Sequence, residues 1–371
     1  MSAAAKHVLI AGGGFAALEA LAALHAHAQG AVAPMLLAPE AEFHYRPTAV
    51  LTPFTGQSGE HYPLAEVAAD FGAPLHRGAL ELVDLDARQV VTGDRAVIAY
   101  DELVVAVGAT TAPSVRGAIL FRGRRDVEPV RRLVDDLSSD RSGAVVFVIP
   151  PGARWALPMV ELALLSGARA RRGRVHLVTA ETEPLEVFGP TPAAAVRAAL
   201  AQSRVQVHAG AVARSFDGAR LWLDTAAALP CDAVVALPEL VGPHIVGLPH
   251  DAHGFLPVDG YGRVLGTDVH AAGDGTDVPY KQGGVAALLA DVIARRIARG
   301  AGVDVRAEPL RPVLRAVLAL PNGRLFLRRA VDEPDGAISS EPVWWPPAKV
   351  AAPHLAAYLA TRRMEYALAA A

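Results

Sequence analysis

The stretch KHVLIAGGGFAALEA, residues 6–20, decides the fold of this chain. Its apolar run at residues 8–11 is typical of a short buried strand, and an Ala-rich helical pattern starts directly after the triple glycine 12–14. A pyrophosphate binds at such a turn because glycine lets the backbone come close and because the helix N-terminus favours negative charge. Two of the glycines and Ala17 occupy the small-residue positions of the G-x-G-x-x-G pattern, in which Ala is accepted at the third. The stretch therefore predicts a dinucleotide-binding unit, with an ordinary tight turn as the alternative.

Length, charge and composition limit the class of protein. The 371 residues suffice for two domains and an appendage, and a hydrophobic content of 52% suffices for full cores. A net charge of -3 argues against a nucleic-acid partner. No apolar run approaches the roughly 18 residues needed to cross a bilayer, and no secretory signal pattern opens the chain. We therefore expect a cytoplasmic protein without a transmembrane segment, and its positive mean hydropathy leaves peripheral membrane contact open.

Cysteine chemistry is limited to one residue, Cys231. A redox-active disulfide within one chain requires two cysteines, so this chemistry is excluded. Because Cys231 precedes the apolar run 233–237, we expect it to be a small core residue. The sequence predicts no metal site.

The loop after the second predicted strand, residues 35–38, carries two further candidates. In a dinucleotide fold the end of this strand normally places an acid on the ribose, but here it holds Ala38 and Pro39. Glu40 follows directly and reaches the ribose only if the loop turns back. Arg46 lies in the segment FHYRP, which either lines the cofactor or forms an ordinary surface loop.

A meander and a further strand come next. Residues 75–98 alternate between apolar and polar, which predicts a small antiparallel meander. Residues 100–109 have the pattern of a buried strand that ends at Ala106, Val107 and Gly108. A strand end with glycine suits close approach of the backbone to a ligand, so we expect these three residues at the cofactor.

A second α/β unit is predicted by a strand at 144–149, helices at 159–170 and 192–202, and a strand at 175–179 between them. Its first turn reads PPGARWALP, residues 150–158, where a glycine-rich turn would belong. Three prolines and a tryptophan remove the free N–H groups and the space that bind a pyrophosphate. The second unit therefore lacks the fingerprint of a nicotinamide dinucleotide site.

The last informative stretch starts with a short strand that ends at Gly273 and Asp274, which places a carboxylate beside a ligand. Lys281, Gln282 and Gly283 then precede an apolar helix, whose positive N-terminal dipole points at the same place. Together these features predict a site for a ring that gains negative charge on reduction.

Three separated motifs resemble those of the two-dinucleotide-domain flavoprotein oxidoreductases. The turn GGGFAA resembles the FAD pyrophosphate motif of this family. Residues 100–109 resemble its second strand motif, with Val107 where Thr is usual, and the sequence AAGD at 271–274 resembles its ribityl-binding motif. The resemblance covers about residues 5–300 and implies FAD as the cofactor.

Within this family the chain resembles most the sulfide:quinone oxidoreductase and flavocytochrome c sulfide dehydrogenase branch. That branch also has a Pro-rich segment ending in aliphatic-x-Glu, matched by residues 150–161, and a Pro-x-Lys-x-Gly segment, matched by Pro279, Lys281 and Gly283. The match implies that Glu161 handles protons near the flavin ring and that Lys281 stabilises the reduced ring. The paired cysteines with which this branch oxidises sulfide are missing, so the resemblance does not extend to that chemistry.

The order of these units predicts an α/β fold of two Rossmann-like three-layer domains followed by a C-terminal tail. Residues 1–111 and 232–303 are expected to form a discontinuous FAD-binding domain. Residues 112–231 are expected to form a second Rossmann-like domain with a degenerate nucleotide motif.

The tail, residues 304–371, contains two adjacent tryptophans between prolines, which form a rigid amphipathic surface. An exposed apolar patch of this size is rare on a monomer. We therefore expect Trp344 and Trp345 to be mostly buried, over the flavin side or in the interface of a homodimer.

Three functions fit these patterns. The leading one is an FAD-dependent oxidoreductase that transfers electrons between a small organic or quinone-like substrate and the flavin. The second is an NAD(P)H-dependent flavin reductase or dehydrogenase, and the third is a flavin-binding scaffold that acts through a partner protein. We predict Lys281 and Glu161 as catalytic residues. The predicted cofactor contacts are Gly12, Gly13, Gly14, Phe15, Ala16, Glu40, Arg46, Ala106, Val107, Gly108, Gly273, Asp274, Lys281, Gln282 and Gly283.

Overall fold

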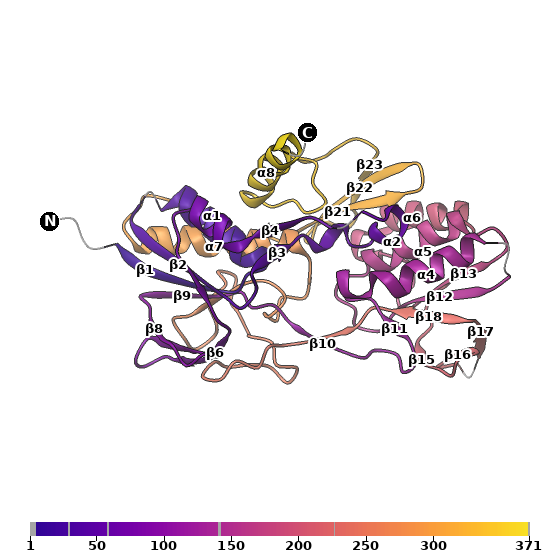
Figure 1. Ribbon diagram of the computed structural model, residues 1–371, viewed down its shortest axis with the longest axis horizontal. Coiled ribbons are helices and arrows are strands. Elements are labelled where there is room, and N and C mark those ends of the chain that lie inside the picture. Colours follow the sequence, from indigo (N-terminus) through magenta and orange to yellow (C-terminus); the bar gives the residue numbers. More distant parts are fainter. Residues whose placement is uncertain (1–4, 29, 58, 140–141, 226, 370–371) are drawn as a thin grey trace.

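The computed structural model describes residues 5–28, 30–57, 59–139, 142–225 and 227–369 of the chain. Two five-stranded parallel sheets form its two halves, with the strand orders β20-β9-β1-β2-β5 in the first unit and β11-β18-β12-β13-β14 in the second (Figure 1). A C-terminal part packs against both units. The expected α/β fold with two Rossmann-like sheets is confirmed.

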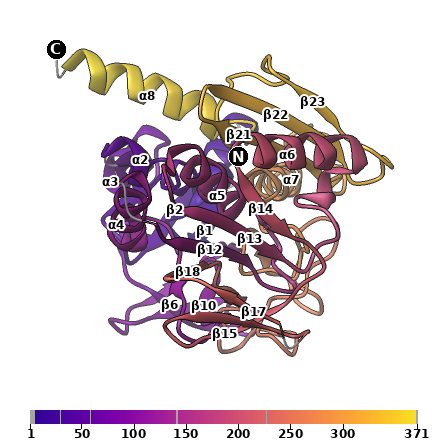
Figure 2. The ribbon, with the colours of Figure 1, turned by 90° about the vertical axis from the view of Figure 1, so that its right-hand side faces the viewer.

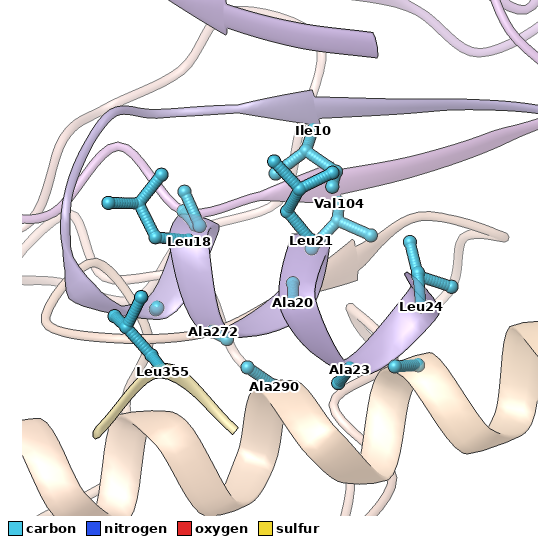
Figure 3. Close-up of a cluster of buried hydrophobic side chains, with 14 of the residues drawn as sticks. Ile10, Leu18, Ala20, Leu21, Ala23, Leu24, Val104, Ala272, Ala290 and Leu355 are labelled. Atoms are coloured by element: carbon cyan, nitrogen blue, oxygen red, sulfur yellow. The ribbon is translucent and has the colours of Figure 1, made fainter. Parts of the chain in front are cut away.

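The first unit is built around a buried helix. Its strands are β1 (Lys6–Ala11), β2 (Val32–Ala38), β5 (Leu75–Arg77), β9 (Glu102–Val105) and β20 (His270–Ala271). Its helices are α1 (Phe15–His27), α3 (Leu64–Asp70) and α7 (Gly283–Gly300). Because α1 is apolar on most of its surface, it is buried between the sheet and α7 (Figure 3). Ala20, Ala23 and Ala290 lie where the two helices meet, and these small side chains let the backbones come close.

The expected antiparallel meander is present as β6 (Leu80–Asp84), β7 (Gln89–Thr92) and β8 (Val97–Ala99). Its predicted start was too early, because β5 pairs with β2 in the parallel sheet. A second small antiparallel pair, β3 (Glu42–His44) and β4 (His61–Pro63), encloses the turn η1 (Arg46–Thr48) and the short helix α2 (Thr52–Thr55) in sequence.

The second unit has the strand-helix alternation that the sequence predicted. Its parallel strands are β11 (Ile119–Leu120), β12 (Ala144–Ile149), β13 (Arg174–Thr179), β14 (Val205–His208) and β18 (Ala233–Ala236). Its helices are α4 (Val127–Ser138), α5 (Leu157–Arg169) and α6 (Pro190–Gln202), with the short turns η2 (Arg124–Asp126) and η3 (Glu186–Phe188). An antiparallel sheet of β15 (Ala213–Phe216), β16 (Arg220–Leu223) and β17 (Ala228–Pro230) lies beside them.

The strand β18 belongs to the second unit, so the chain returns to the first unit later than predicted. β18 pairs with β11 and β12, although the predicted boundary at residue 231 assigns it to the first unit. β12 is buried along all six residues, as is typical of an interior strand of a parallel sheet. Its two neighbours are β13 and β18. The return therefore follows residue 236.

The two crossings between the units pair with each other. β10 (Thr110–Ala112) leaves the first unit, β19 (Glu239–Val241) returns to it, and the two form an antiparallel link (Figure 1). The Thr110 hydroxyl also donates to the carbonyl oxygen of Val241 at 3.2 Å. Since β10 follows soon after β9, this link holds the second unit next to the carboxyl ends of the first sheet.

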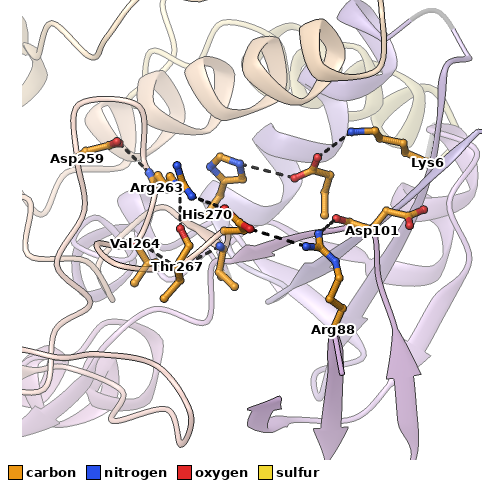
Figure 4. A network of polar contacts seen from close by, with 11 residues as sticks. Lys6, Arg88, Asp101, Asp259, Arg263, Val264, Thr267 and His270 are labelled. Carbon is orange, nitrogen blue, oxygen red and sulfur yellow. Dashed lines mark hydrogen bonds and ion pairs between the residues drawn. The ribbon is translucent and has the colours of Figure 1, made fainter. Parts of the chain in front are cut away.

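A polar network fixes the two-residue strand β20 at the edge of the first sheet (Figure 4). His270 Nε2 lies 3.9 Å from Glu102, and the carboxylate of Glu102 also accepts from Lys6 at 3.1 Å. Burial lowers the pKa of His270 to about 4, so its ring is neutral at pH 7. In the preceding loop, Asp259 accepts from the Arg263 amide at 2.9 Å. These contacts position β20 and the motif that follows it.

The C-terminal part consists of an antiparallel sheet, β21 (Val313–Leu320), β22 (Gly323–Ala330) and β23 (Ala337–Ser339), followed by α8 (Leu355–Ala369). Apolar residues of β21 join the core of the second unit, whereas Leu355 and Leu359 join that of the first. Between these parts, the Val350 amide donates to the Tyr45 hydroxyl at 3.1 Å. Arg362 and Arg363 form ion pairs with Glu66 and Glu60 of the first unit, and the end of α8 projects from the body of the molecule (Figure 2).

The burial predicted over the flavin side is wrong for Trp345, which is 86% exposed in the single chain, and its burial in a homodimer interface stays a prediction. Trp344 is half-buried, since its ring packs edge-on against Phe326 at 5.1 Å and its Nε1 donates to the carbonyl oxygen of Ala348 at 3.0 Å. Because one indole fills the place beside Phe326, the adjacent side chain points to solvent.

Two expectations from composition can be compared with the structure. Cys231 is buried in an apolar cluster, as predicted, and burial raises the pKa of its thiol to about 11, so the thiol stays protonated at neutral pH. Among the described residues, no helix combines the length and the apolar surface needed to cross a membrane.

Candidate functional site

The carboxyl ends of three strands meet at one edge of the first sheet. β1 and β9 pair in parallel with Ala11 opposite Val105, and β9 pairs with β20 with Val105 opposite Ala271. In open parallel sheets, ligands bind outside the carboxyl ends of the strands. The three predicted motifs follow directly after these ends, so residues far apart in the chain come together here.

Close backbone contacts join the motifs. A Cβ atom on Gly12, whose φ is +136°, would lie 2.2 Å from the carbonyl oxygen of Ala106. A Cβ atom on Gly273 would lie 3.1 Å from the Cβ of Ala16. Only glycine allows an approach this close at Gly12. The glycine turn, the end of β9 and the segment after β20 therefore form one surface.

The residues after β9 lie at the same surface. The carbonyl oxygen of Gly108 is 2.7 Å from where a Cβ atom on Gly275 would be. Val107 is 39% exposed, which is unusual for the end of an otherwise buried strand. Its side chain is therefore accessible, and the contact of residues 106–108 with a cofactor stays a prediction.

Gly14 differs from its neighbours because it faces open space. It is the N-cap of α1 with an ordinary φ of -94°, and a Cβ atom on it would have no heavy atom within 4 Å. A Cβ atom on Gly13, in contrast, would lie 2.7 Å from Leu64. Neither backbone strain nor internal packing requires glycine at position 14. The space beside Gly14 is open to a group from outside the chain, and the positive helix terminus there favours an anion.

Glu40 and Phe15 flank the glycine turn. Glu40 Oε2 lies 3.4 Å from the position of a Cβ atom on Gly13, so the loop after β2 turns back toward the turn. This is the geometry that a ribose-binding role for Glu40 requires. Phe15 packs against Phe43 and Tyr45, with ring centroids 5.8 and 5.9 Å apart, and this fixes the start of α1.

A cavity of about 410 Å³ opens between the two units, next to these strand ends. Its volume lies within the range of small-molecule sites. The lining is rich in proline and contains the aromatic side chains of Phe121, Trp155 and Phe255. Its charged and ionisable side chains are Arg46, Arg122, Arg154, Glu239, His253, Asp274 and Lys281.

Lys281 lines this cavity although it is only 6% exposed. Its ammonium group donates to the carbonyl oxygens of Asp274, at 3.0 Å, and Thr276, and lies 4.2 Å from the ring centroid of Phe255. Burial lowers the pKa of Lys281 to about 8, although the Asp274 carboxylate opposes this shift. Lys281 is therefore mostly a cation at pH 7 and loses its charge above pH 8.

The carboxyl group of Asp274 balances the cations of the site. Burial raises its pKa, and the charges of Lys281 and Arg46 oppose the rise. Arg46 comes from η1 and Lys281 from the residues before α7, so two distant segments place cations near the same carboxyl group. The arrangement attracts an anionic ligand and offers Asp274 as an acceptor for hydroxyl groups.

Gln282 and Gly283 lie behind the cavity at the start of α7. Gln282 is the N-cap of the helix, and its Nε2 donates to the carbonyl oxygen of Arg315 on β21. Its Oε1 is buried, with no hydrogen-bond partner among the described residues. A Cβ atom on Gly283 would lie 3.1 Å from Val350 of the tail. The tail therefore supports the helix start that carries the predicted cofactor contacts.

Glu161 lies apart from this group. It is on α5, 1% exposed, and does not belong to the cavity lining. Its carboxylate accepts from the Lys349 ammonium at 2.8 and 2.7 Å and from the Ala319 amide at 2.8 Å. Burial raises its pKa, and the Lys349 charge opposes the rise. Its role in proton transfer stays a prediction, and its contacts are those of a buried ion pair.

The turn after β12 has few free N–H donors, as its prolines predicted. The amides of Met159 and Val160 both donate to the carbonyl oxygen of Ala156, at 3.1 and 3.3 Å, and Pro158 has no N–H group. Trp155 packs against Phe188 with ring centroids 5.9 Å apart. The N-terminus of α5 therefore offers a pyrophosphate few free donors, although the turn itself lines the cavity between the units.

Sequence reasoning missed most side chains of the cavity, and two of these, Arg154 and Phe255, contact each other beside Lys281. Arg154 belongs to the turn that was interpreted only as an obstruction, and its guanidinium lies 5.0 Å from the ring centroid of Phe255. Phe255 lies in a loop without any recognised motif, so no pattern pointed to it. The one signal for Arg154 in the sequence was its place in the Pro-rich turn, where an arginine brings a cation next to a predicted site.

Comparison with known proteins agrees with this geometry. Residues 6–290 match the family described as pyridine nucleotide-disulphide oxidoreductase. No curated protein matches the sequence. Among solved structures, the sulfide:quinone oxidoreductase of the hyperthermophilic bacterium Aquifex aeolicus has a TM-score of 0.82 at 17% identity, over 90% of this chain and 87% of that one.

Two further solved structures share the fold. A ferredoxin reductase for the CYP199A2 system of Rhodopseudomonas palustris has a TM-score of 0.68 at 21% identity, over 88% of this chain and 82% of that one. A NAD-dependent persulfide reductase from A. fulgidus has a TM-score of 0.66 at 17% identity, over 87% of this chain and 64% of that one. At these identities the likeness shows a common fold and does not extend to substrates.

The two parallel sheets, with three motifs that meet at the strand ends of the first sheet, define a protein of the two-dinucleotide-domain class. The chain belongs to the pyridine nucleotide-disulphide oxidoreductase family and is an oxidoreductase of the flavoprotein type.

Proposed function

We propose that this protein is an FAD-dependent oxidoreductase that exchanges electrons with a small planar, quinone-like substrate and uses no redox disulfide. The observation that carries the proposal is the convergence of the three motifs around the space at Gly14. When bound, FAD supplies the electron-transfer chemistry. The first test is the visible spectrum of the purified protein, and a colourless protein that also fails to take up added FAD would rule the proposal out.

The chain's own residues divide the binding task. The amides at the start of α1 bind the pyrophosphate, and Glu40 accepts from the ribose. Asp274 accepts from hydroxyl groups of the cofactor. Lys281 provides a buried cation where negative charge develops on reduction, and Phe255 holds that cation in place.

The cavity favours an electron-poor planar substrate. Its apolar and proline-rich walls suit a flat ring, and Trp155 and Phe121 offer faces for stacking. Arg154 adds a cation for a substrate oxygen that becomes negative on reduction. Cys231 lies in a separate apolar cluster and is not among the residues of the cavity, so no thiol takes part.

We expect NADH and NADPH to reduce the bound flavin poorly. The physical reason is the turn 150–158, where the amides near the start of α5 donate within the chain. Anaerobic mixing with micromolar NADH or NADPH, followed by the flavin absorbance, measures this. Photochemical reduction of the same sample is the positive control. Rapid bleaching by either nucleotide would favour the second candidate, a nicotinamide-dependent flavin reductase, for which the name of the family is the supporting observation.

We expect Lys281→Ala to lower the reduction potential of the bound flavin while FAD stays bound. Loss of a partly buried cation near the ring should cost about 1–2 kcal/mol, or about 20–45 mV for a two-electron couple. Equilibrium titration against a redox dye measures the potential. Arg132→Ala is the matched control, because Arg132 is on α4 of the second unit, outside the cavity lining, and 75% exposed. An unchanged potential in Lys281→Ala would remove Lys281 from the site.

The substrate class has its own test. The photoreduced protein, mixed anaerobically with a soluble quinone such as menadione, should be reoxidised much faster than free reduced flavin is. If instead only a partner protein accepts the electrons, the third function, a scaffold that acts through a partner, is favoured. The homodimer and the discontinuous FAD-binding domain are part of this proposal, and light scattering of the purified protein tests the former.

A further inference from the structure

Three side chains that are distant in the sequence meet on one side of the first unit. His27 is the last residue of α1, Asp291 lies in α7, and His354 directly precedes α8. Asp291 Oδ1 is 2.7 Å from His27 Nε2 and 2.9 Å from His354 Nε2. The two imidazole rings are nearly perpendicular, with centroids 4.9 Å apart. The three ligand atoms all lie within 4.8 Å of one another.

This donor set suits a divalent transition metal ion. Neutral imidazole nitrogen and carboxylate oxygen bind Zn²⁺ at about 2.0–2.2 Å, which places tetrahedral ligand atoms about 3.3 Å apart. The distances of 2.7 and 2.9 Å therefore need to open by only a few tenths of an ångström. The exposed side-chain fractions of 14%, 13% and 23% leave access for an ion and for one water ligand.

Neighbouring groups hold the three ligands in position. The second oxygen of Asp291 accepts from Arg295 Nε at 2.8 Å, which leaves Oδ1 for the ion. The buried carboxylate of Glu19 accepts from the amides of His354 and Leu355 at 2.9 and 2.8 Å, which fixes the backbone of the third ligand. Such outer contacts orient metal ligands and raise affinity.

The same neighbours set the electrostatic balance. The positive charge of Arg295 weakens the attraction for a cation, and Glu19 offsets this effect only in part because burial raises the pKa of its carboxyl group to about 7. Hydrogen bonds from His354, Arg295 and His27 hold the pKa of Asp291 below its ordinary value, whereas the bond to Asp291 raises the pKa of His354. Protons therefore compete for the imidazole of His354, so binding should weaken as the pH falls.

We propose that His27, Asp291 and His354 bind one divalent transition metal ion of the Zn²⁺ type and thereby clamp the base of α8 to α1 and α7. The site is independent of the flavin, since none of the three residues lines the cavity between the units. No sequence pattern indicated the site, because its ligands lie on α1, on α7 and directly before α8.

The test is a calorimetric titration of chelator-treated, tag-free protein with ZnCl₂. We expect one ion per chain at micromolar affinity, a rise in the thermal midpoint, and slower tryptic cleavage at Arg362 and Arg363 of α8. His27→Gln and His354→Gln should each weaken binding at least tenfold. His25→Gln is the matched control, since this histidine is on the same helix but exposed and contacts Phe71 instead.

A second probe keeps the result independent of folding defects. Co²⁺ bound by two histidines and an aspartate should absorb at wavelengths longer than flavin does, and Asp291→Asn should remove this band while preserving an oxygen for the two imidazoles. The proposal is overturned if wild-type protein shows no saturable Zn²⁺ or Co²⁺ binding. It is equally overturned if His27→Gln and Asp291→Asn bind as tightly as the His25→Gln control.

Discussion

Glu161→Ala is expected to lower the free energy of unfolding by about 3–5 kcal/mol. The carboxylate is 1% exposed and accepts both contacts from Lys349, so its loss leaves an ammonium group that is itself only 11% exposed without a counter-charge. It also leaves the Ala319 amide without its acceptor. Urea unfolding followed by circular dichroism measures the difference.

The matched variants separate charge from packing. Lys349→Met should cost less than Glu161→Ala, because burial already raises the pKa of Glu161 and the carboxyl group can take up a proton. The double variant Glu161→Leu, Lys349→Met should recover at least half of the loss, since it removes both buried charges. A Glu161→Ala protein within 1 kcal/mol of wild type would show that water reaches the pair.

The same residue carries the predicted proton-handling role, which a milder variant can isolate. Glu161→Gln keeps an oxygen for the Ala319 amide but cannot exchange a proton. If its flavin reoxidation by quinone stays at the wild-type rate across pH, the role of Glu161 is structural. A rate that falls and loses its pH dependence would support proton transfer.

Gly14→Val is expected to weaken FAD binding at least a hundredfold without unfolding the protein. The φ of -94° suits valine, and a Cβ atom there has no neighbour within 4 Å, so the apoprotein tolerates the change. The branched side chain would fill the space that the pyrophosphate needs. Flavin content of the purified variant and titration with FAD measure the loss, which corresponds to about 2.7 kcal/mol or more.

Gly59→Val is the matched control for this prediction. Gly59 also has an ordinary φ and no atom within 4 Å of a Cβ position, but it lies outside the glycine turn. It should bind FAD as wild type does. Normal flavin content in Gly14→Val would show that the cofactor binds elsewhere, and the proposed function would need another site.

The motifs and their meeting place could be predicted from the sequence because each depends on local pattern and a general rule. The apolar run before Gly12 and the one before Gly108 predict buried parallel strands, and the carboxyl ends of parallel strands share an edge. Open space beside Gly14 required the structure. So did the return of Glu40 to the turn, since a loop's direction is set by its packing.

What could not be predicted depends on contacts between distant segments. β18 was assigned to the wrong sheet because its apolar pattern suits either sheet and only pairing with β12 decides. Phe255 and Lys349 lie in segments without motifs, and their roles come from the side chains they meet. Trp345 was expected to be buried because two adjacent tryptophans between prolines would expose a large apolar patch, but Trp344 takes the available contact with Phe326.

The tail contacts have a consequence for biosynthesis. Three buried polar groups made early, on Glu19, Tyr45 and Glu161, have hydrogen-bond partners between residues 349 and 355, and for Glu161 this partner is its counter-charge, Lys349. Until residues 349–355 leave the ribosome, the nascent chain has both sheets available but carries the carboxyl groups of Glu19 and Glu161 in apolar surroundings. Such an intermediate favours their protonation and keeps the core loose. The arrival of residues 349–355 is thus the event that locks the fold, and a product that stops short of Lys349 should be an early target for proteolysis.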